Sequence, residues 1–232
     1  LPRIVSERVN SVVSDEWGNK LIRSWNQGWW EAPIRIGEKI AGLVGATSDQ
    51  VIVCDSVSVD LFKLIMAALS LKPSRSKIIS DSLNFPSDLY ILQGCVDLLG
   101  NKHKIVRIGS LDDEITPDLD LLYKEIDQDT ALVTLSHVLF KSGFLYDMEA
   151  ITEKAHEVGA LVIWDLCHSV GALPIELDSC QVDFAVGCTY KYLNGGPGSP
   201  AFIYANKNLR NINTSPIWGW WGQKDPFTFA ID

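Results

Sequence analysis

Apolar residues along this chain follow two spacings that alternate from one segment to the next. Ile36, Ile40 and Val44 recur every four positions, which places them on one face of a helix. Residues 160–164 are almost continuously apolar, as is typical of a parallel strand covered on both faces. The pattern predicts helices at 35–44, 59–71, 87–99, 117–126 and 147–159, and strands at 51–53, 77–80, 104–108, 130–135, 160–164, 183–187 and 200–204.

Capping residues support several of these helix boundaries. Thr116 followed by Pro117 has the order of a helix cap and a first-turn proline. Asp147 is suited to cap the helix that follows it, and either Ser56 or Ser58 is suited to cap the helix that begins near residue 59. The connections between predicted elements are therefore short turns.

The alternation of strands and helices defines the fold class. It favours an α/β protein with a doubly wound, mostly parallel sheet. Ligands of such sheets bind beyond the carboxyl ends of the strands. Asp165 directly follows one predicted strand, and Lys191 comes shortly after another. We therefore expect both side chains to face one crevice.

Composition narrows the class of protein further. Of the 232 residues, 47% are hydrophobic and 21% are charged, which fits a soluble globular chain with a sizeable core. The formal net charge of -9 argues against binding to nucleic acid or to an anionic membrane. No apolar run approaches the roughly 20 residues of a membrane-spanning helix.

The cysteines indicate a reducing compartment. Their number, five, is odd, and none form a C-x-x-C pair. This favours reduced thiols in a cytoplasmic protein over a disulfide framework. A zinc site from Cys167, His168 and Cys188 is conceivable, but the spacing matches no standard zinc motif, so we expect no metal.

Asp165 and Lys191 carry the most informative chemistry. Lys191 lies in the glycine-rich run 187–198, and a lysine among small residues can bind pyridoxal 5'-phosphate (PLP) as a Schiff base. A buried carboxylate can hold the proton on the pyridine nitrogen, which makes the ring an electron sink. Taken alone, such a lysine is more often a solvated turn residue and such an aspartate a helix cap. Their order and spacing together favour a PLP site.

Other residues that follow predicted strands suit the same site. Ser58 and the neighbouring backbone N–H groups at a helix N-terminus would suit a phosphate, and Phe85 would stack on a pyridine ring. Ser136 would reach a ring substituent. His168 would stack on the ring or orient the carboxylate of Asp165. Each residue also has a structural alternative, as a cap, a core residue or a packed histidine.

Tryptophan is concentrated in two clusters. Residues 25–30 and 218–221 contain six of the eight Trp residues. Exposed indoles can line an aromatic pocket or a subunit interface. We favour a core or interface role over substrate contact.

Three motifs are jointly specific for a known family. They are Phe-Pro-Ser-Asp at 85–88, Asp-Leu-x-His at 165–168 and Tyr-Lys-Tyr-Leu-Asn-x-Gly at 190–196. Through them the chain resembles the kynureninases, which are fold-type-I PLP enzymes of the aminotransferase class V group. The resemblance runs in order over essentially the whole chain. It is also carried by Trp25-Asn26, Gly28-Trp29, Val57-Ser58, Ser136 and the Gly-Trp-Trp-Gly segment at 219–222.

The resemblance implies an activity and the residues that perform it. The family hydrolyses L-kynurenine, or its 3-hydroxy form, to L-alanine and an anthranilate. Lys191 would carry PLP and later move the proton at Cα, Asp165 would pair with the ring nitrogen, and Tyr190 would join them as a catalytic residue. The residues implied to bind the cofactor are Val57, Ser58, Phe85, Pro86, Ser87, Asp88, Ser136, Asp165, His168, Tyr190, Lys191 and Trp220.

The resemblance also implies a domain organisation. Residues 1–34 would form an N-terminal segment near the active site, and residues 35–232 the PLP-binding large domain of an aspartate aminotransferase-like enzyme. The chain starts without Met and stops without a closing helix, so we expect it to be part of a longer polypeptide. The missing C-terminal small domain would supply an Arg for the substrate carboxylate. A cytoplasmic homodimer that acts in tryptophan catabolism, in the kynurenine pathway toward NAD, is expected.

Two alternatives remain beside this interpretation. A cysteine desulfurase or an aminotransferase of the same fold would use the same lysine and aspartate, although a desulfurase also needs a reactive Cys on a mobile loop. A truncated, non-catalytic homologue would dimerise through its Trp-rich surfaces. The chain departs from the family pattern at Ser58, where many relatives have Thr, at His137 and at Gln223.

Overall fold

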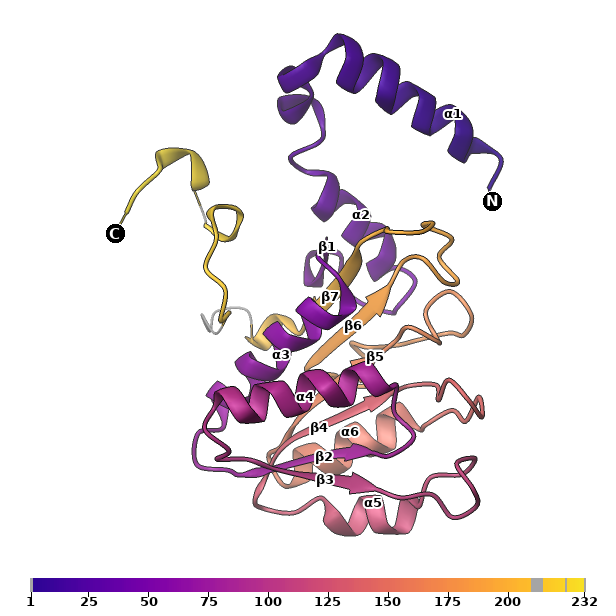
Figure 1. Ribbon diagram of the computed structural model, residues 1–232, viewed down its shortest axis with the longest axis vertical. Helices are drawn as coiled ribbons and strands as arrows, with labels where there is room; N and C mark the ends of the chain where they lie inside the picture. Colours follow the sequence, from indigo (N-terminus) through magenta and orange to yellow (C-terminus); the bar gives the residue numbers. More distant parts are fainter. Residues whose placement is uncertain (1, 210–214, 224, 232) are drawn as a thin grey trace.

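A seven-stranded sheet forms the centre of the molecule (Figure 1). The computed structural model describes residues 2–209, 215–223 and 225–231. The strands are β1 (Val51–Cys54), β2 (Lys77–Asp81), β3 (Lys104–Ile108), β4 (Thr130–Ser136), β5 (Leu161–Asp165), β6 (Phe184–Cys188) and β7 (Ala201–Ala205). Their order is β1-β7-β6-β5-β4-β2-β3. The strands β2 to β6 are parallel, and β7 is antiparallel to both of its neighbours, β6 and β1.

Helices cover both faces of the sheet, because alternate strand residues point to opposite sides. Ile78 and Leu132 pack under α3 (Val57–Leu71) and α4 (Pro86–Leu98). Ile79 and Val133 belong to the opposite core, with α2 (Ala32–Ala41), α5 (Leu119–Glu125) and α6 (Met148–Glu157). The predicted α/β class with a doubly wound, mostly parallel sheet is confirmed.

Two predicted helices have bounds that differ from those expected. The helix expected from residue 117 begins at Leu119, because Asp118 is its cap and accepts a hydrogen bond from the Leu121 N–H at 2.9 Å. Thr116 instead donates its N–H and hydroxyl to Asp112 in the preceding turn. The helix expected at 35–44 is α2, which begins earlier at Ala32 with a proline in its first turn and ends at Ala41. By contrast, the Asp147 cap is confirmed, since its carboxylate accepts the N–H of Ala150 at 3.0 Å.

Short helical segments precede and follow the sheet domain. Figure 1 shows the N-terminal ones, in indigo, projecting beyond the sheet. Among the described residues, no helix is both long and apolar enough to cross a membrane. The segments before the domain are α1 (Ile4–Ser11), a π-helix (Val12–Asn19) and a 3-10 helix (Leu21–Gln27). Those after it are 3-10 helices at Lys207–Leu209, Trp220–Gly222 and Pro226–Thr228, and a further one, Ser48–Gln50, joins α2 to β1.

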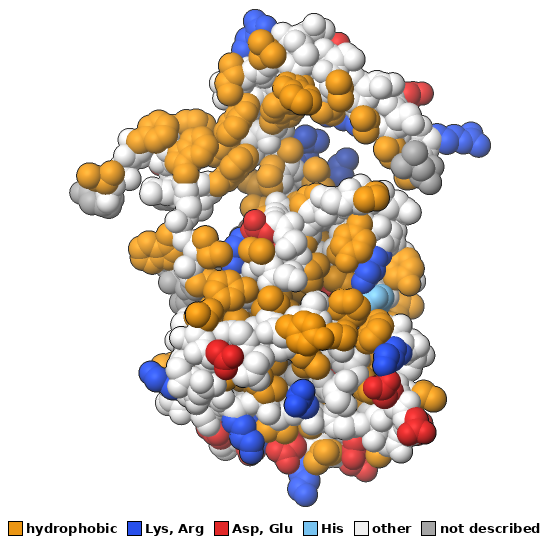
Figure 2. All heavy atoms as spheres, viewed as in Figure 1, with side chains coloured by type: hydrophobic (Ala, Val, Ile, Leu, Met, Phe, Trp, Pro, Cys, Tyr) orange, Lys and Arg blue, Asp and Glu red, His pale blue; other side chains and the backbone are white. Residues whose placement is uncertain are grey.

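Exposed apolar side chains occur on the sheet domain and also on the segments at both ends of the described chain (Figure 2). On the N-terminal segments, Trp17 is 63% exposed and Ile22 71%. On the C-terminal segment, Trp218 is 81% exposed and Phe229 70%. Apolar surface of this extent marks an interaction site in most soluble proteins.

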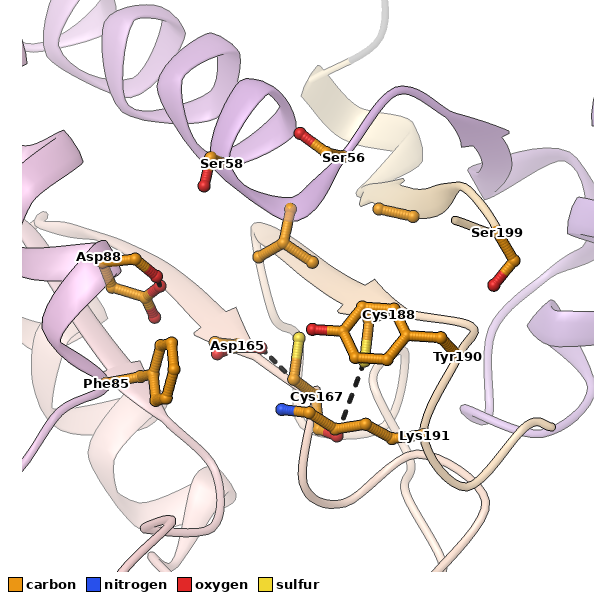
Figure 3. A pocket seen from close by; sticks show the side chains of 13 residues that line it. Ser56, Ser58, Phe85, Asp88, Asp165, Cys167, Cys188, Tyr190, Lys191 and Ser199 are labelled. Carbon is orange, nitrogen blue, oxygen red and sulfur yellow. Dashed lines mark hydrogen bonds between the residues drawn. The ribbon is translucent and has the colours of Figure 1, made fainter. Parts of the chain in front are cut away.

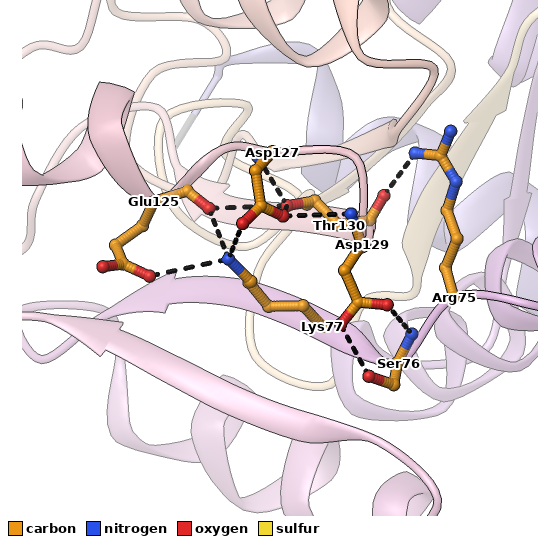
Figure 4. Close-up of polar contacts among 7 residues, drawn as sticks. All are labelled: Arg75, Ser76, Lys77, Glu125, Asp127, Asp129 and Thr130. Atoms are coloured by element: carbon orange, nitrogen blue, oxygen red, sulfur yellow. Dashed lines mark hydrogen bonds and ion pairs between the residues drawn. The ribbon is translucent and has the colours of Figure 1, made fainter.

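Charged residues fix the amino-terminal ends of β2 and β4 (Figure 4). These ends lie opposite the carboxyl ends of the parallel strands, where Asp165 stands at the end of β5. Lys77 Nζ lies 2.5 Å from Asp127 Oδ2 and 3.0 Å from the Glu125 carbonyl oxygen. Asp129 accepts the N–H and the hydroxyl of Ser76 at 3.0 and 2.7 Å. These bonds hold the first residue of β2 against the turn that leads into β4.

Arg75 ties the same edge together, and its removal should destabilise the fold. Its guanidinium donates to the carbonyl oxygens of Thr130 at 2.7 Å and Val158 at 2.6 Å. Arg75→Ala leaves both acceptors without their charged donor, so the free energy of unfolding should fall by about 2 kcal/mol. Urea denaturation measures this change. Arg107→Ala, an exposed position on β3, is the matched control and should change stability by less than about 0.5 kcal/mol.

His156 should make stability depend on pH. Its Nε2 lies 2.8 Å from Asp183 Oδ2, and this hydrogen bond, followed by the charge of Asp183, raises the pKa of His156 against the effect of burial. The stabilisation is therefore fully present below the unfolded pKa of about 6.5 and is lost as the pH rises through the higher folded pKa. The free energy of unfolding, measured by urea denaturation, should therefore differ more between wild type and His156→Gln at a pH of about 5.5 than at a pH of about 8.5. Equal differences at the two pH values would contradict the assignment.

Candidate active site

A cavity opens beyond the carboxyl ends of β5 and β6, beside the first turns of α3 and α4 (Figure 3). It therefore lies where an open α/β sheet binds ligands. Asp165 and Lys191 both line it, as the sequence predicts for residues that follow neighbouring strands. The complete lining is Ser56, Val57, Ser58, Phe85, Ser87, Asp88, Asp165, Cys167, Cys188, Tyr190, Lys191, Ser199 and Ala201.

Lys191 presents a primary amine to this cavity. Its Nζ lies 2.9 Å from Nε2 of His168 and 5.6 Å from the centroid of the Phe85 ring. Burial, and then the charge of Lys191, lower the pKa of His168, so its imidazole is neutral at pH 7 and accepts a hydrogen bond from the ammonium. The amine is thus held on the Phe85 side of the cavity by a neutral partner (Figure 3).

Two buried carboxyl groups face each other across the same cavity. Asp165 and Asp88 are each 5% exposed. Burial, followed by the negative charge of Asp165, raises the pKa of Asp88 to about 9. Asp165 Oδ1 accepts the Cys167 backbone N–H at 2.7 Å. Asp88 is therefore protonated at neutral pH, and the carboxyl group of Asp165 beside it suits a protonated ring nitrogen.

The first turn of α3 provides an anion site. Ser56 occupies the N-cap position of this 15-residue helix but makes no side-chain capping bond, so the first N–H groups remain available. Ser58 adds a hydroxyl, and the helix dipole favours negative charge there. Asp55 lies just outside the helix, and Lys63, within α3, forms an ion pair with it and offsets its charge. A phosphate group fits these donors.

A glycine lets the loops that carry Asp165 and Lys191 approach each other. Gly171 adopts a φ of +80°, a left-handed conformation that side chains rarely adopt. A Cβ at this position would also lie 3.2 Å from the Tyr192 carbonyl oxygen. The chain after His168 can therefore pack directly against the loop after Lys191.

Four residues predicted to bind the cofactor lie outside the cavity lining: Pro86, Ser136, His168 and Trp220. Ser136 is buried, and its hydroxyl donates to Asn84 Oδ1 at 2.5 Å. Asn84 Oδ1 also accepts the Phe85 N–H at 2.9 Å, so this bond positions the aromatic ring. Pro86 starts α4 beside that ring, and Trp220 belongs to an aromatic cluster described next. Direct contacts of these four residues with a cofactor stay predictions.

The two Trp-rich segments pack against each other. The rings of Trp30 and Trp221 are stacked with centroids 4.5 Å apart, and Trp220 lies 6.0 Å from Trp25 and 5.6 Å from Trp30. Trp220 remains 40% exposed. Residues almost 200 positions apart in the chain thus form one partly exposed aromatic cluster.

Several residues around the cavity were missed from the sequence. Cys167, Cys188, Ser199 and Ala201 line it without an assigned role. The available signal for Cys167 and Cys188 was their position, because each lies at or just beyond the carboxyl end of a strand that borders the cavity. Phe140 was missed as well. Its ring meets that of Phe85 edge-on at 5.2 Å and lies 6.4 Å from that of His168.

Comparison with known proteins defines the class. A model of the aminotransferase class-V family matches residues 27–216, and the chain belongs to this family. Among curated proteins, it is 44% identical over 225 residues to a kynureninase of Pseudomonas fluorescens, and 42% identical over 231 residues to one of Burkholderia mallei strain SAVP1. These alignments cover 95% and 97% of this chain but 52% and 54% of the relatives. The chain therefore spans about half the length of the curated relatives it matches.

Solved structures agree on the fold. The complex of the cystine C-S lyase C-DES with cysteine persulfide has a TM-score of 0.79 at 18% identity. The matched region covers 95% of this chain and 58% of the lyase chain. The apo cysteine desulfurase of Thermococcus onnurineus NA1 has a TM-score of 0.77 at 21% identity, and the matched region covers 94% of this chain and 54% of the desulfurase chain. At such identities, the likeness shows the aminotransferase-like fold alone.

Members of this family use PLP, the cofactor expected from the sequence. The residues present fit it on chemical grounds. Lys191 offers an amine for the aldehyde, the pair of Asp88 and Asp165 offers a negative charge for the ring nitrogen, and the first turn of α3 offers donors for the phosphate. Phe85 provides an aromatic face between them.

Proposed function

We propose that the complete protein hydrolyses L-kynurenine, or 3-hydroxykynurenine, to L-alanine and anthranilate, or 3-hydroxyanthranilate. The observation that carries this proposal is the 44% identity to a kynureninase over 95% of the chain. The cavity supports it, because Lys191 and Asp165 line one space with Phe85. The alignment covers 52% of that relative, and we propose that the residues that bind the substrate carboxylate are not among those of this chain.

PLP supplies an electron sink when it is bound. We assign its covalent attachment to Lys191, whose amine would hold the cofactor and, when free, would move the proton at Cα of the substrate. His168 accepts a hydrogen bond from Lys191 at 2.9 Å and so keeps the amine in position. Asp165 would hold the proton on the ring nitrogen. Protonated Asp88 would donate a hydrogen bond to Asp165 and so limit the negative charge in the cavity.

Tyr190 has a distinct part in this proposal. Burial, and next the charge of Cys188, raise the pKa of Tyr190 to about 12, so its phenol is protonated at neutral pH. In the cavity it can donate a hydrogen bond to a phosphate or a proton to the reacting carbon. It suits proton donation better than removal of a proton from the attacking water.

The context of the activity is also proposed. We place the protein in the cytoplasm as a homodimer that acts in tryptophan catabolism, with residues 1–34 as a segment near the complete active site and 35–232 as the large domain. The exposed apolar ends of the chain support an interface, and two-fold dimers are the commonest oligomers. Sedimentation of the full-length protein at micromolar concentration should give the mass of a dimer.

An assay of the full-length protein with PLP tests the reaction. Incubation with L-kynurenine should release anthranilate, detected by fluorescence, and L-alanine in equal amounts. Parallel incubations with 3-hydroxykynurenine and with L-cysteine separate the substrate classes. Release of alanine from cysteine but not from either kynurenine, with sulfide formed when a thiol reductant is present, would support the desulfurase alternative. A protein that shows no visible cofactor absorption sensitive to borohydride would support the non-catalytic one.

A further inference from the structure

Two thiols lie next to each other in the cavity wall, and the proposed reaction uses neither. In the parallel pair β5 and β6, Asp165 is the partner of Val186. The Leu166 N–H bonds the Val186 carbonyl at 2.8 Å, which extends the pairing one step further. Two positions beyond the partners are Cys167 and Cys188. Cys188 alternates with its strand neighbour onto the face of Val186, and both thiols line the cavity beside Asp165.

The two cysteines are close enough to be bonded. Cys188 Sγ lies 3.9 Å from the Cys167 carbonyl oxygen, to which its thiol donates a hydrogen bond. Neighbouring strands are about 4.8 Å apart, within the roughly 4.4–6.8 Å between the Cα atoms of bridged cysteines. Both are free thiols in this structure (Figure 3).

Their surroundings make one thiol nucleophilic. The hydrogen bond from Cys167, and next the charge of Lys191, lower the pKa of Cys188 to about 6 despite burial. The thiolate, and not the thiol, attacks an oxidant. Cys167 is 4% exposed and Cys188 1%, so a small oxidant reaches them only through the cavity that both line.

We propose that Cys167 and Cys188 form a peroxide-sensitive dithiol whose oxidation to a disulfide prevents PLP from binding. The effect on PLP rests on the proposed function; the disulfide does not. The Cys188 thiolate attacks a peroxide oxygen and becomes a sulfenic acid, releasing one water after protonation. The Cys167 sulfur then attacks the Cys188 sulfur and releases the second water. The two thiols lose two electrons, hydrogen peroxide gains them, and a thiol reductant reverses the change.

Two consequences follow from the position of the pair. A disulfide would join the chain just after Asp165 to the chain just before Lys191 within the cavity wall, so it would change the shape of the site in which both groups must meet the cofactor. Bound PLP would in turn fill the cavity and shield the thiols. Oxidation should therefore be fast in the apo form and slow in the PLP-loaded form.

Peptide mapping of the full-length protein tests the disulfide directly. Apo and PLP-loaded samples are treated with hydrogen peroxide, alkylated and digested without reductant. The apo sample should yield a peptide pair that links Cys167 to Cys188, and a mass lower by about 2 Da, because two hydrogen atoms leave. Its uptake of PLP, followed by visible absorption, should be lost and should return with dithiothreitol. The loaded sample should keep both thiols.

Matched variants separate this site from general oxidation. Cys167→Ala and Cys188→Ala should form no such link, and peroxide should not alter the PLP uptake of either variant relative to its own untreated sample. Cys180→Ser, which removes a half-buried thiol outside the cavity lining, should behave as wild type. Full alkylation of Cys167 and Cys188 in peroxide-treated apo protein would overturn the proposal. If the reduced protein takes up no PLP, the proposed function fails, while the linked peptide still decides whether the dithiol exists.

Discussion

Replacing Lys191 with alanine should abolish covalent attachment of PLP to the complete protein. Lys191 lines the cavity, and its Nζ lies 5.6 Å from the Phe85 ring, on which the cofactor is expected to stack. Loss of this amine also removes the group that moves the proton at Cα, so turnover should fall by about 10³-fold or more. Borohydride reduction followed by peptide mass spectrometry should find a phosphopyridoxyl group on Lys191 in wild type and nowhere in Lys191→Ala.

A nearby lysine provides the control for this experiment. Lys141 forms an ion pair with Glu114 and is not among the residues that line the cavity. Lys141→Ala should therefore retain the label on Lys191. A phosphopyridoxyl group on any other lysine of the wild-type protein would show that the assignment of Lys191 is wrong.

The architecture was predictable because each strand carries its own burial signal. The continuous apolar run in β5 is buried on both faces of the sheet, as the sequence alone indicates. Local capping is less predictable, because neighbouring polar residues compete. Asp118 and not Thr116 caps α5, since Asp112 already holds both donors of Thr116. The antiparallel direction of β7 depends on its pairing with β1, a contact between distant residues that no local pattern encodes.

The part of the site that could be predicted consists of residues at or just beyond the carboxyl ends of strands. Asp165 and Lys191 follow neighbouring parallel strands, so their meeting in one cavity follows from the topology. The state of Asp88 was not predictable, because its raised pKa depends on burial and on a carboxylate 77 positions away in the chain. The same holds for the contact between Trp220 and Trp25, which joins the two ends of the chain.

Asp165→Asn should leave PLP attached to Lys191 but reduce turnover by about 10²–10³-fold, the range for loss of one preorganised charge. A neutral amide cannot keep the ring nitrogen protonated, so the negative charge that develops when Cα loses its proton is less stabilised. Visible absorption measures cofactor binding, and the rate of anthranilate release measures turnover. Wild-type turnover in this variant would reduce Asp165 to a structural role.

The neighbouring carboxyl group sharpens this prediction. Because the charge of Asp165 helps to raise the pKa of Asp88, Asp165→Asn lowers the pKa of Asp88 and lets it ionise in place of the lost carboxylate. Part of the activity of Asp165→Asn should therefore return as the pH rises. Asp88→Asn alone removes a group that is already neutral at pH 7, so it should reduce turnover less than Asp165→Asn does. The double variant Asp88→Asn with Asp165→Asn should lose both the residual activity and its rise with pH. A double variant no slower than Asp165→Asn would show that the two carboxyl groups do not share this charge.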